Sequence, residues 1–322
     1  MKHPAVRYHV LHETRYSYES PVSLSRQLLH LTPRECLWQH CLEHAISVSP
    51  EPSVVRERTD CFGNAVRELA LEFPHDDLQV HAESTIDVFS RSTEGASPDS
   101  GTGTHRCAAD EPDTCLPVSP AWEAVRDALA YGARPVLLEA SRFQFESPHV
   151  RVKREFARYA RESFDAGRPL FEAVHSLMSR IHEEFSFDPE ATTVATPVLE
   201  VLAERRGVCQ DFAHLMLSCL RSLGLAARYV SGYLLTHPPP GQPRMVGADA
   251  SHAWVSVYSP SDGEGNWVDF DPTNCLLPDV QHITLAWGRD FADVSPLRGV
   301  ILGGDTHELE VAVTVTPLAD AS

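Results

Sequence analysis

The segment Gly207-Val208-Cys209-Gln210-Asp211-Phe212 places a cysteine at the predicted start of a helix. From this cysteine onward, apolar residues recur at helical spacing and form one stripe, which comprises Cys209, Phe212, Ala213, Met216, Leu217, Leu220 and Leu223. Gly224 ends the pattern, as glycine commonly does just beyond a helix. Cys209 therefore occupies the first turn, where unpaired N–H groups and the helix dipole favour an anion. Because the thiolate is the nucleophilic form of cysteine, this position favours nucleophilic catalysis, and the same N–H groups could hold an oxyanion.

Two segments rich in β-forming residues follow, and they offer a base and a carboxylate. The first covers residues 252–258, so that His252 opens a predicted strand. The second covers residues 267–271 and ends at Asp271, because Pro272 cannot donate a hydrogen bond to a neighbouring strand. A cysteine at a helix start, packed on a sheet with histidine and aspartate on adjacent strands, is the arrangement that a thiol triad requires.

The residues alone leave open which group orients the histidine. Asp269 shares a predicted strand face with Asp271, since side chains alternate along a strand, and Asn274 follows closely. Each of the three could accept or share a hydrogen bond with His252. The pattern therefore predicts a site for acyl transfer with a cysteine, a histidine and one of three orienting residues.

Four separate blocks in a fixed order resemble the bacterial transglutaminase-like proteins, which are members of the papain-like transglutaminase superfamily. The blocks are residues 207–215, 227–233, 249–254 and 271–274. Residues 6 to 90 also resemble the β-rich N-terminal domain that accompanies this core, and residues 282–293 resemble its C-terminal extension. The resemblance thus covers most of the chain.

This resemblance implies an α+β fold, with an N-terminal antiparallel β-sandwich domain followed by a papain-like transglutaminase core. In that core the catalytic cysteine lies at a helix N-terminus packed on an antiparallel sheet. By the same resemblance Cys209 is the nucleophile, His252 is the general base and acid, and Asp271 is the orienting carboxylate. Asp271 is preferred because the family places its carboxylate just before a Pro-Thr pair.

One position departs from the family pattern. Members often have tyrosine where this chain has Phe187, so a hydroxyl that could help to hold an oxyanion is missing. Gln210 or backbone N–H groups would then have to supply the donors. Gln210, Phe187 and Trp254 are our candidates for substrate or oxyanion contacts, and Trp254 is also expected to form core or cleft wall.

The sequence divides into four parts by composition. We expect a β-rich domain in residues 1–90, a linker or mobile loop in 91–119, a helical segment and catalytic core in 120–278, and a C-terminal extension with β character in 279–322. Predicted strands cover residues 7–12, 45–48 and 80–89, and predicted helices cover 122–131 and 150–163, with another beginning at Pro169. The β-rich residues show no obvious chemistry. The proline-rich loop 236–247 is predicted to border the substrate cleft.

Composition restricts the partners. A formal net charge of −18 disfavours binding to nucleic acid or to an anionic membrane surface. Because no signal-like or membrane-spanning apolar run is visible, we expect a cytoplasmic protein. The eight cysteines show no disulfide framework and are expected to be mostly free thiols. A cluster of histidines and cysteines in residues 30–44 lacks the spacing of a zinc site, so we expect no metal and no cofactor.

Three functions fit these observations. The first is acyl transfer on a carboxamide or peptide bond of a protein or peptide substrate, through a thioester on Cys209. The second is hydrolysis by the same triad, as in a cysteine peptidase or amidase, because only acceptor access and cleft hydration separate the two outcomes. The third is a non-catalytic module that holds a peptide or partner. The sequence does not identify the acyl donor, the acceptor or the oligomeric state.

Overall fold

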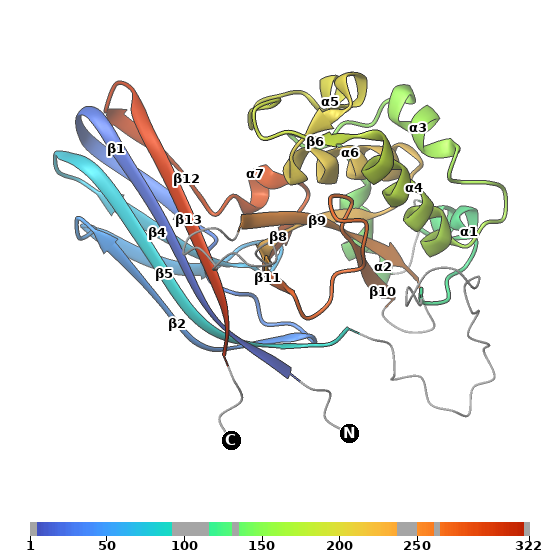
Figure 1. Cartoon of the computed structure of the whole chain (residues 1–322), viewed down its shortest axis with the longest axis horizontal. Helices are drawn as coiled ribbons and strands as arrows, with labels where there is room; N and C mark the ends of the chain where they lie inside the picture. Colours follow the sequence, from blue (N-terminus) through green and yellow to red (C-terminus); the bar gives the residue numbers. More distant parts are fainter. Residues whose placement is uncertain (1–4, 92–115, 131–134, 237–249, 261–264, 319–322) are drawn as a thin grey trace, which may run out of the picture.

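The computed structural model describes residues 5–91, 116–130, 135–236, 250–260 and 265–318. Figure 1 shows a large antiparallel sheet beside a mixed helical and β core. The predicted loop 236–247, apart from its first residue, and most of the predicted linker 91–119 lie outside the described residues.

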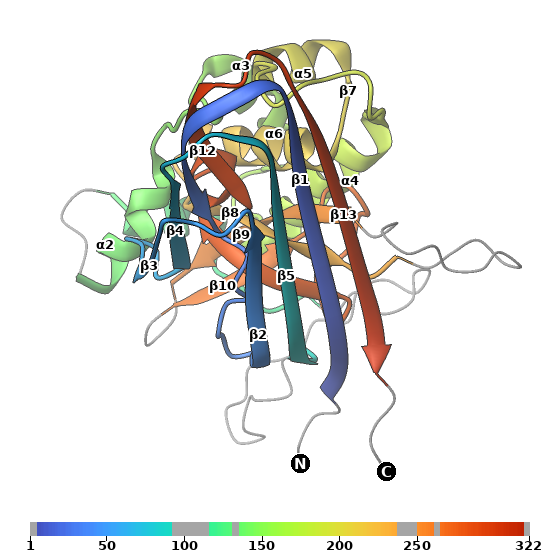
Figure 2. The same ribbon diagram turned by 90° about the vertical axis from the view of Figure 1, so that its left-hand side faces the viewer.

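The large sheet has seven strands built around one long strand. Its strands are β1 (Ala5–Leu29), β2 (Gln39–Ser49), β3 (Val54–Thr59), β4 (Ala65–Leu71), β5 (His75–Phe89), β12 (Leu297–Gly303) and β13 (His307–Leu318). The first half of β1 pairs with β5 and β13, and the second half pairs with β4 and β12. Figure 2 shows β1 bending between these halves. The predicted strand 7–12 is therefore the start of a much longer one.

The bend of β1 turns one sheet into a sandwich. Apolar side chains from both halves meet in a single cluster, which contains Leu29, Leu31, Leu69, Leu71, Leu78, Val80 and Ala82. Along β5 buried residues occur at every second position from Leu78, and this alternation places Leu78, Val80 and Ala82 inward. The predicted antiparallel β-sandwich is confirmed, and its last two strands come from the C-terminal part of the chain.

The core places helices against a four-stranded antiparallel sheet with strand order β10-β9-β8-β11 (Figure 1). These strands are β8 (Ala227–Leu234), β9 (Ala250–Ser259), β10 (Asn266–Phe270) and β11 (His282–Gly288). The helices are α1 (Trp122–Ala128), α2 (Pro135–Ser141), α3 (Arg154–Arg161), α4 (Leu170–Glu184), α5 (Val198–Glu204), α6 (Cys209–Ser222) and α7 (Phe291–Val294), with a 3-10 turn η1 (Arg142–Gln144). Helix α2 was not predicted from the sequence.

Helix α6 lies at the centre of the core. It begins at Cys209 as predicted, and its chain reverses at Gly224, whose φ of +80° suits glycine. Apart from its N-terminal turn and Ser222 it is buried all round, because α3, α4 and α5 cover it on one side and β8 and β9 lie on the other. No helix in the described part of the chain is both long enough and apolar enough to cross a bilayer.

Candidate functional site

The start of α6 is held by a short parallel strand pair. β6 (Ser186–Phe187) pairs with β7 (Arg206–Gly207), and the N–H of Asp188 donates to the carbonyl of Gly207 at 2.9 Å. The next residue, Val208, has extended backbone, and α6 begins after it. This connection brings Cys209 to a partly buried position in the first helical turn. The N–H groups of that turn have no partner within the helix and remain available to an anion.

Asp211 fixes the backbone that leads into the helix. Its Oδ2 accepts hydrogen bonds from the Val208 N–H at 2.9 Å and from the Thr192 hydroxyl at 2.6 Å. A Cβ atom on Gly207 would lie 2.7 Å from the same oxygen, so only glycine fits there. The family-like motif thus contains a glycine and an aspartate with structural roles, and the role of Asp211 was not foreseen from the sequence.

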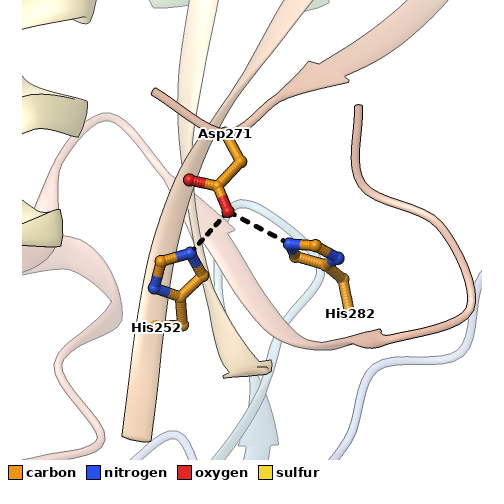
Figure 3. Close-up of side chains that lie close together, drawn as sticks. All are labelled: His252, Asp271 and His282. Carbon is orange, nitrogen blue, oxygen red and sulfur yellow. Dashed lines mark hydrogen bonds and ion pairs between the residues drawn. The ribbon is translucent and has the colours of Figure 1, made fainter. Parts of the chain in front are cut away.

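His252 and Asp271 form a buried pair (Figure 3). The distance from His252 Nε2 to Asp271 Oδ2 is 2.7 Å. Cys209 and His252 line the same cavity, and interaction with the Cys209 side chain raises the pKa of the imidazole. Because Nε2 faces the carboxylate, Nδ1 is the ring nitrogen that remains for the sulfur. The structure therefore brings together the cysteine, histidine and aspartate that the sequence singled out.

The carboxylate of Asp271 is surrounded by donors. Oδ1 accepts from the backbone N–H groups of Thr273 at 2.9 Å and Asn274 at 3.2 Å. Oδ2 accepts from the Asn274 side-chain amide at 2.7 Å as well as from His252. Burial would raise the pKa of Asp271, but hydrogen bonds from His252 and His282 outweigh burial and hold that pKa well below its usual range. Asp271 is therefore an anion at neutral pH.

The same network keeps a proton on His252. Burial lowers the pKa of an imidazole, but here the hydrogen bond that His252 donates to Asp271 and the interaction with Cys209 oppose it and raise the pKa of His252 from 6.5 to about 10. A protonated histidine beside a cysteine at a helix N-terminus favours a thiolate-imidazolium pair. Such a pair supplies both a nucleophile and a proton donor for the leaving group.

A second histidine, His282 at the start of β11, also contacts Asp271. Its Nε2 lies 3.2 Å from Asp271 Oδ2, and its ring packs edge-on to Trp254 with the centroids 5.2 Å apart. Burial lowers the pKa of His282 even though Asp271 opposes the effect. The other ring nitrogen, Nδ1, is buried without a partner among the described residues, which fits a neutral ring that donates from Nε2. No pattern in the sequence predicted this contact.

Asp269 does not reach the histidine. Its Oδ2 accepts from the Trp254 indole at 2.9 Å and forms an ion pair with Arg91. Of the three alternatives left open by the sequence, Asp271 contacts His252 as a carboxylate. Asn274 donates to Asp271, and its Nδ2 also lies 3.3 Å from His252 Nε2.

The three remaining candidates occupy different environments. Gln210 lines a cavity of about 220 Å³ together with Cys209 and His252. Phe187 is 58% exposed on β6 and does not line this cavity. Trp254 is fully buried, so it packs behind the histidines, in the core role that the sequence also allowed.

The cavity is closed by the large sheet. Strand β1 contributes His12, Thr14 and Tyr16, and β13 contributes Leu309 and Val311. No catalytic or binding residue was predicted in these strands, yet they form part of the wall of the cavity that Cys209 lines. Residues from the N-terminal and the C-terminal parts of the described chain therefore line the site together.

His252, Asp271 and His282 also offer three ligand atoms within 4.8 Å of one another, and no other group of this kind occurs in the described residues. Zinc ligands lie about 2.0–2.1 Å from the ion, which puts two tetrahedral ligands about 3.3 Å apart. The 2.7 Å separation of His252 Nε2 from Asp271 Oδ2 is instead that of a hydrogen bond. The residues as placed fit a proton network and do not fit a tetrahedral zinc ion.

Comparison with known proteins agrees with this geometry. Residues 8–87 match the bacterial transglutaminase-like N-terminal region, and residues 157–272 match the transglutaminase-like superfamily. Uncharacterized proteins from Mycobacterium bovis and Mycobacterium tuberculosis are each 39% identical over 313 residues, covering 97% of this chain and 93% of theirs. The chain belongs to the bacterial transglutaminase-like family.

Two further similarities concern function and fold. A protein-glutamine gamma-glutamyltransferase from Pseudomonas aeruginosa is 29% identical over 154 residues, which are 43% of this chain and 23% of that protein. A solved structure from Cytophaga hutchinsonii, with a provisional assignment as a cysteine protease, superposes with a TM-score of 0.69 at 20% identity. It covers 99% of this chain and 93% of the other. The second similarity establishes the shared fold.

Asp271→Asn is expected to lower turnover by about 10³ to 10⁴-fold, because the neutral amide cannot stabilise the imidazolium and favours the wrong tautomer. Asp269→Asn is the matched control on the same strand face, and it should cost far less because Asp269 pairs with Arg91 and Trp254. Both variants would be compared by steady-state turnover at equal folded concentration. A larger loss from Asp269→Asn would move the orienting role to that residue.

Proposed function

We propose that this protein catalyses acyl transfer from a carboxamide of a protein or peptide substrate, with Cys209 as nucleophile, His252 as general base and acid, and Asp271 as orienting carboxylate. The observation that carries the proposal is that Cys209 lines the same cavity as His252, whose Nε2 is held by Asp271. A non-catalytic module has no use for a buried, charged network at this position.

The lining of the catalytic cavity supports a neutral acyl donor. Among the described residues that line it there is no aspartate, glutamate, lysine or arginine. Burial lowers the pKa of His12 in its wall to about 4, so that histidine is neutral at pH 7. A volume of about 220 Å³ is below the range of about 300–1,000 Å³ for drug-sized ligands and suits a single side chain. A glutamine or asparagine carboxamide fits these conditions better than a carboxylate.

The reaction proceeds in two steps. The sulfur of Cys209 attacks the carboxamide carbon, and the oxyanion that forms is held by N–H groups of the first turn of α6, with Gln210 beside them. His252 then gives its proton to the nitrogen, and ammonia leaves as the thioester forms. A primary amine, deprotonated by His252, attacks the thioester to give a substituted amide and restores the thiol. Water in place of the amine gives a carboxylic acid.

Hydrolysis by the same residues is the second candidate. It is favoured by the similarity in fold to the Cytophaga hutchinsonii protein, which extends over almost the whole of both chains. Transfer is favoured by the similarity in sequence to the Pseudomonas aeruginosa transferase, which covers less than half of this chain. Both candidates share the thioester and differ only in the group that resolves it.

A glutamine-containing peptide, incubated with a fluorescent primary amine, is expected to release ammonia and to gain the amine at the glutamine side chain. Mass spectrometry of the peptide separates three products: the amine adduct, the glutamate formed by hydrolysis, and fragments cut at a peptide bond. Cys209→Ala serves as the blank. Ammonia release without amine incorporation would assign an amidase, and backbone fragments would assign a peptidase. Absence of all three products over a set of glutamine and asparagine peptides would contradict the carboxamide donor.

A further inference from the structure

A second cavity, of about 330 Å³, lies between the large sheet domain and the core. It shares no lining residue with the catalytic cavity. Residues from the sheet domain, such as Arg34, and residues from the core, such as Arg142 and Arg228, line it together with Trp267 and Trp287. Nothing in the acyl-transfer mechanism uses these side chains.

Arg228 is the unusual member of this cavity. It is only 6% exposed, yet its guanidinium has no hydrogen bond or ion pair with any residue in the described ranges. Its Nε is buried without a partner. The guanidinium carbon lies 3.7 Å from the ring centroid of Trp287 and 4.2 Å from that of Trp267, so aromatic faces position it. Burial of an unpaired cation is costly unless an anion joins it.

A second arginine faces the same indole. The guanidinium carbon of Arg34 lies 3.5 Å from the ring centroid of Trp287, and its Nε is likewise buried without a partner in the described residues. Its two terminal nitrogens donate to Asn64 Oδ1 at 2.7 Å and to the carbonyl of Phe62 at 3.0 Å. Both guanidinium groups therefore lie against the same indole, and the charge of Arg34 lowers the pKa of Arg228.

Two acids near these cations are already engaged by other groups. Glu139 lines the cavity, but its side chain is 84% exposed and lies 3.3 Å from Arg142. Asp269 is close enough to Arg228 to raise the pKa of that arginine, but its Oδ2 is already engaged by Arg91 and the Trp254 indole. Burial lowers the pKa of Arg228 to about 9, so the group remains a cation at neutral pH. The described residues that line the cavity thus include three arginines and one carboxylate, that of Glu139.

We propose that this cavity is a binding site for a small oxyanion ligand, a carboxylate or a phosphate, which is held by Arg228 with Arg34 and Arg142 beside it. Planar guanidinium groups match the geometry of both anions. The volume falls within the range of small-molecule sites. Because the arginines come from both domains, the bound anion also ties the sheet domain to the core.

Binding is tested with inorganic phosphate and with succinate on the full chain at pH 7, with sodium chloride at matched ionic strength as the reference. Calorimetric titration should show saturable binding of at least one anion, and the melting temperature should rise in proportion to the logarithm of its concentration. The exposed thiol of Cys61, which lines the cavity, should be alkylated more slowly in its presence. Whichever of the two binds more tightly, phosphate or succinate, shows whether the site is built for a phosphate or for a carboxylate.

Two variants in the cavity and two controls locate the site. Arg228→Met should remove binding and melt no lower than wild type without ligand, because an unpaired buried charge is replaced by an apolar chain. Arg142→Met, at the rim, should weaken binding by about tenfold. Arg15→Met, an exposed position on β1, should bind as wild type does. Cys209→Ala should also bind normally, which separates this site from the proposed catalysis.

Failure of both anions to bind wild type beyond the chloride reference would overturn the proposal. Equal binding by Arg228→Met and wild type would overturn it too, as would unchanged alkylation of Cys61 under saturating anion. If Arg228→Met does not fold, Arg142→Met and the Cys61 protection in wild type decide the question.

Discussion

Cys209→Ala is expected to lose all covalent acyl intermediate and to lower turnover of a carboxamide substrate by about 10⁶-fold, because no other group can form the thioester. The variant should fold normally, since the cysteine is only partly buried and alanine suits the first turn of α6. Intact-protein mass spectrometry after mixing with substrate measures the acyl adduct directly.

Cys219→Ala is the matched control, because Cys219 lies on the same helix and is completely buried. Burial raises the pKa of the Cys219 thiol above the range in which it could react. This control should retain full turnover and the acyl adduct. Retained turnover in Cys209→Ala would instead rule out the assignment of the nucleophile.

His252→Ala is expected to slow alkylation of Cys209 by about a hundredfold at pH 6.5, where an ordinary thiol with a pKa of about 8.5 is about 1% thiolate. In wild type the imidazolium of His252 should keep alkylation fast at this pH, since the pKa of His252 is raised to about 10. Peptide mass spectrometry follows the rate against pH, with the buried Cys219 as an internal reference. Identical pH profiles for wild type and variant would show that no activated pair exists.

The raised pKa of His252 also predicts how folding stability depends on pH. The folded protein binds this proton more tightly than the unfolded chain, so the contribution to stability is full below about pH 6.5. It is lost progressively as the pH rises from there through about 10. Thermal unfolding between pH 6 and pH 10 should show a steeper decline for wild type than for His252→Ala. If the stability of both proteins declined with pH at the same slope, His252 would not hold its proton in an ion pair with Asp271.

Much of the site was predictable because it follows from the spacing of residues that are close together in the sequence. The helical stripe after Cys209 and the β-forming residues from His252 onward both reflect spacing along the chain, and the structure forms α6 and β9 there. Asp271 required the resemblance, because alternation alone puts Asp269 on the same face. The register of β9 and β10 separates the two aspartates by setting Asp269 opposite Ser256. Registers depend on turn geometry, which the sequence specifies only weakly.

Long-range contacts account for what was missed. His282 opens β11, which lies at the opposite edge of the core sheet from β10, and the chain after Asp271 crosses over to bring them together. The cavity wall from β1 and β13 likewise joins residues about 300 positions apart. The predicted strand ended at residue 12, whereas β1 continues to Leu29 and passes through Pro21.

The pairing of β1 with β13 bears on when the thiol site becomes complete during biosynthesis. Strand β1 is translated before every other described element, and one of its edges over residues 7–18 stays open until β13, the last described element, has been made. Cys209, His252 and Asp271 all emerge before Leu309 and Val311 close the cleft around them. The lining of the catalytic cavity is therefore complete only after β13 has been made and has paired with β1.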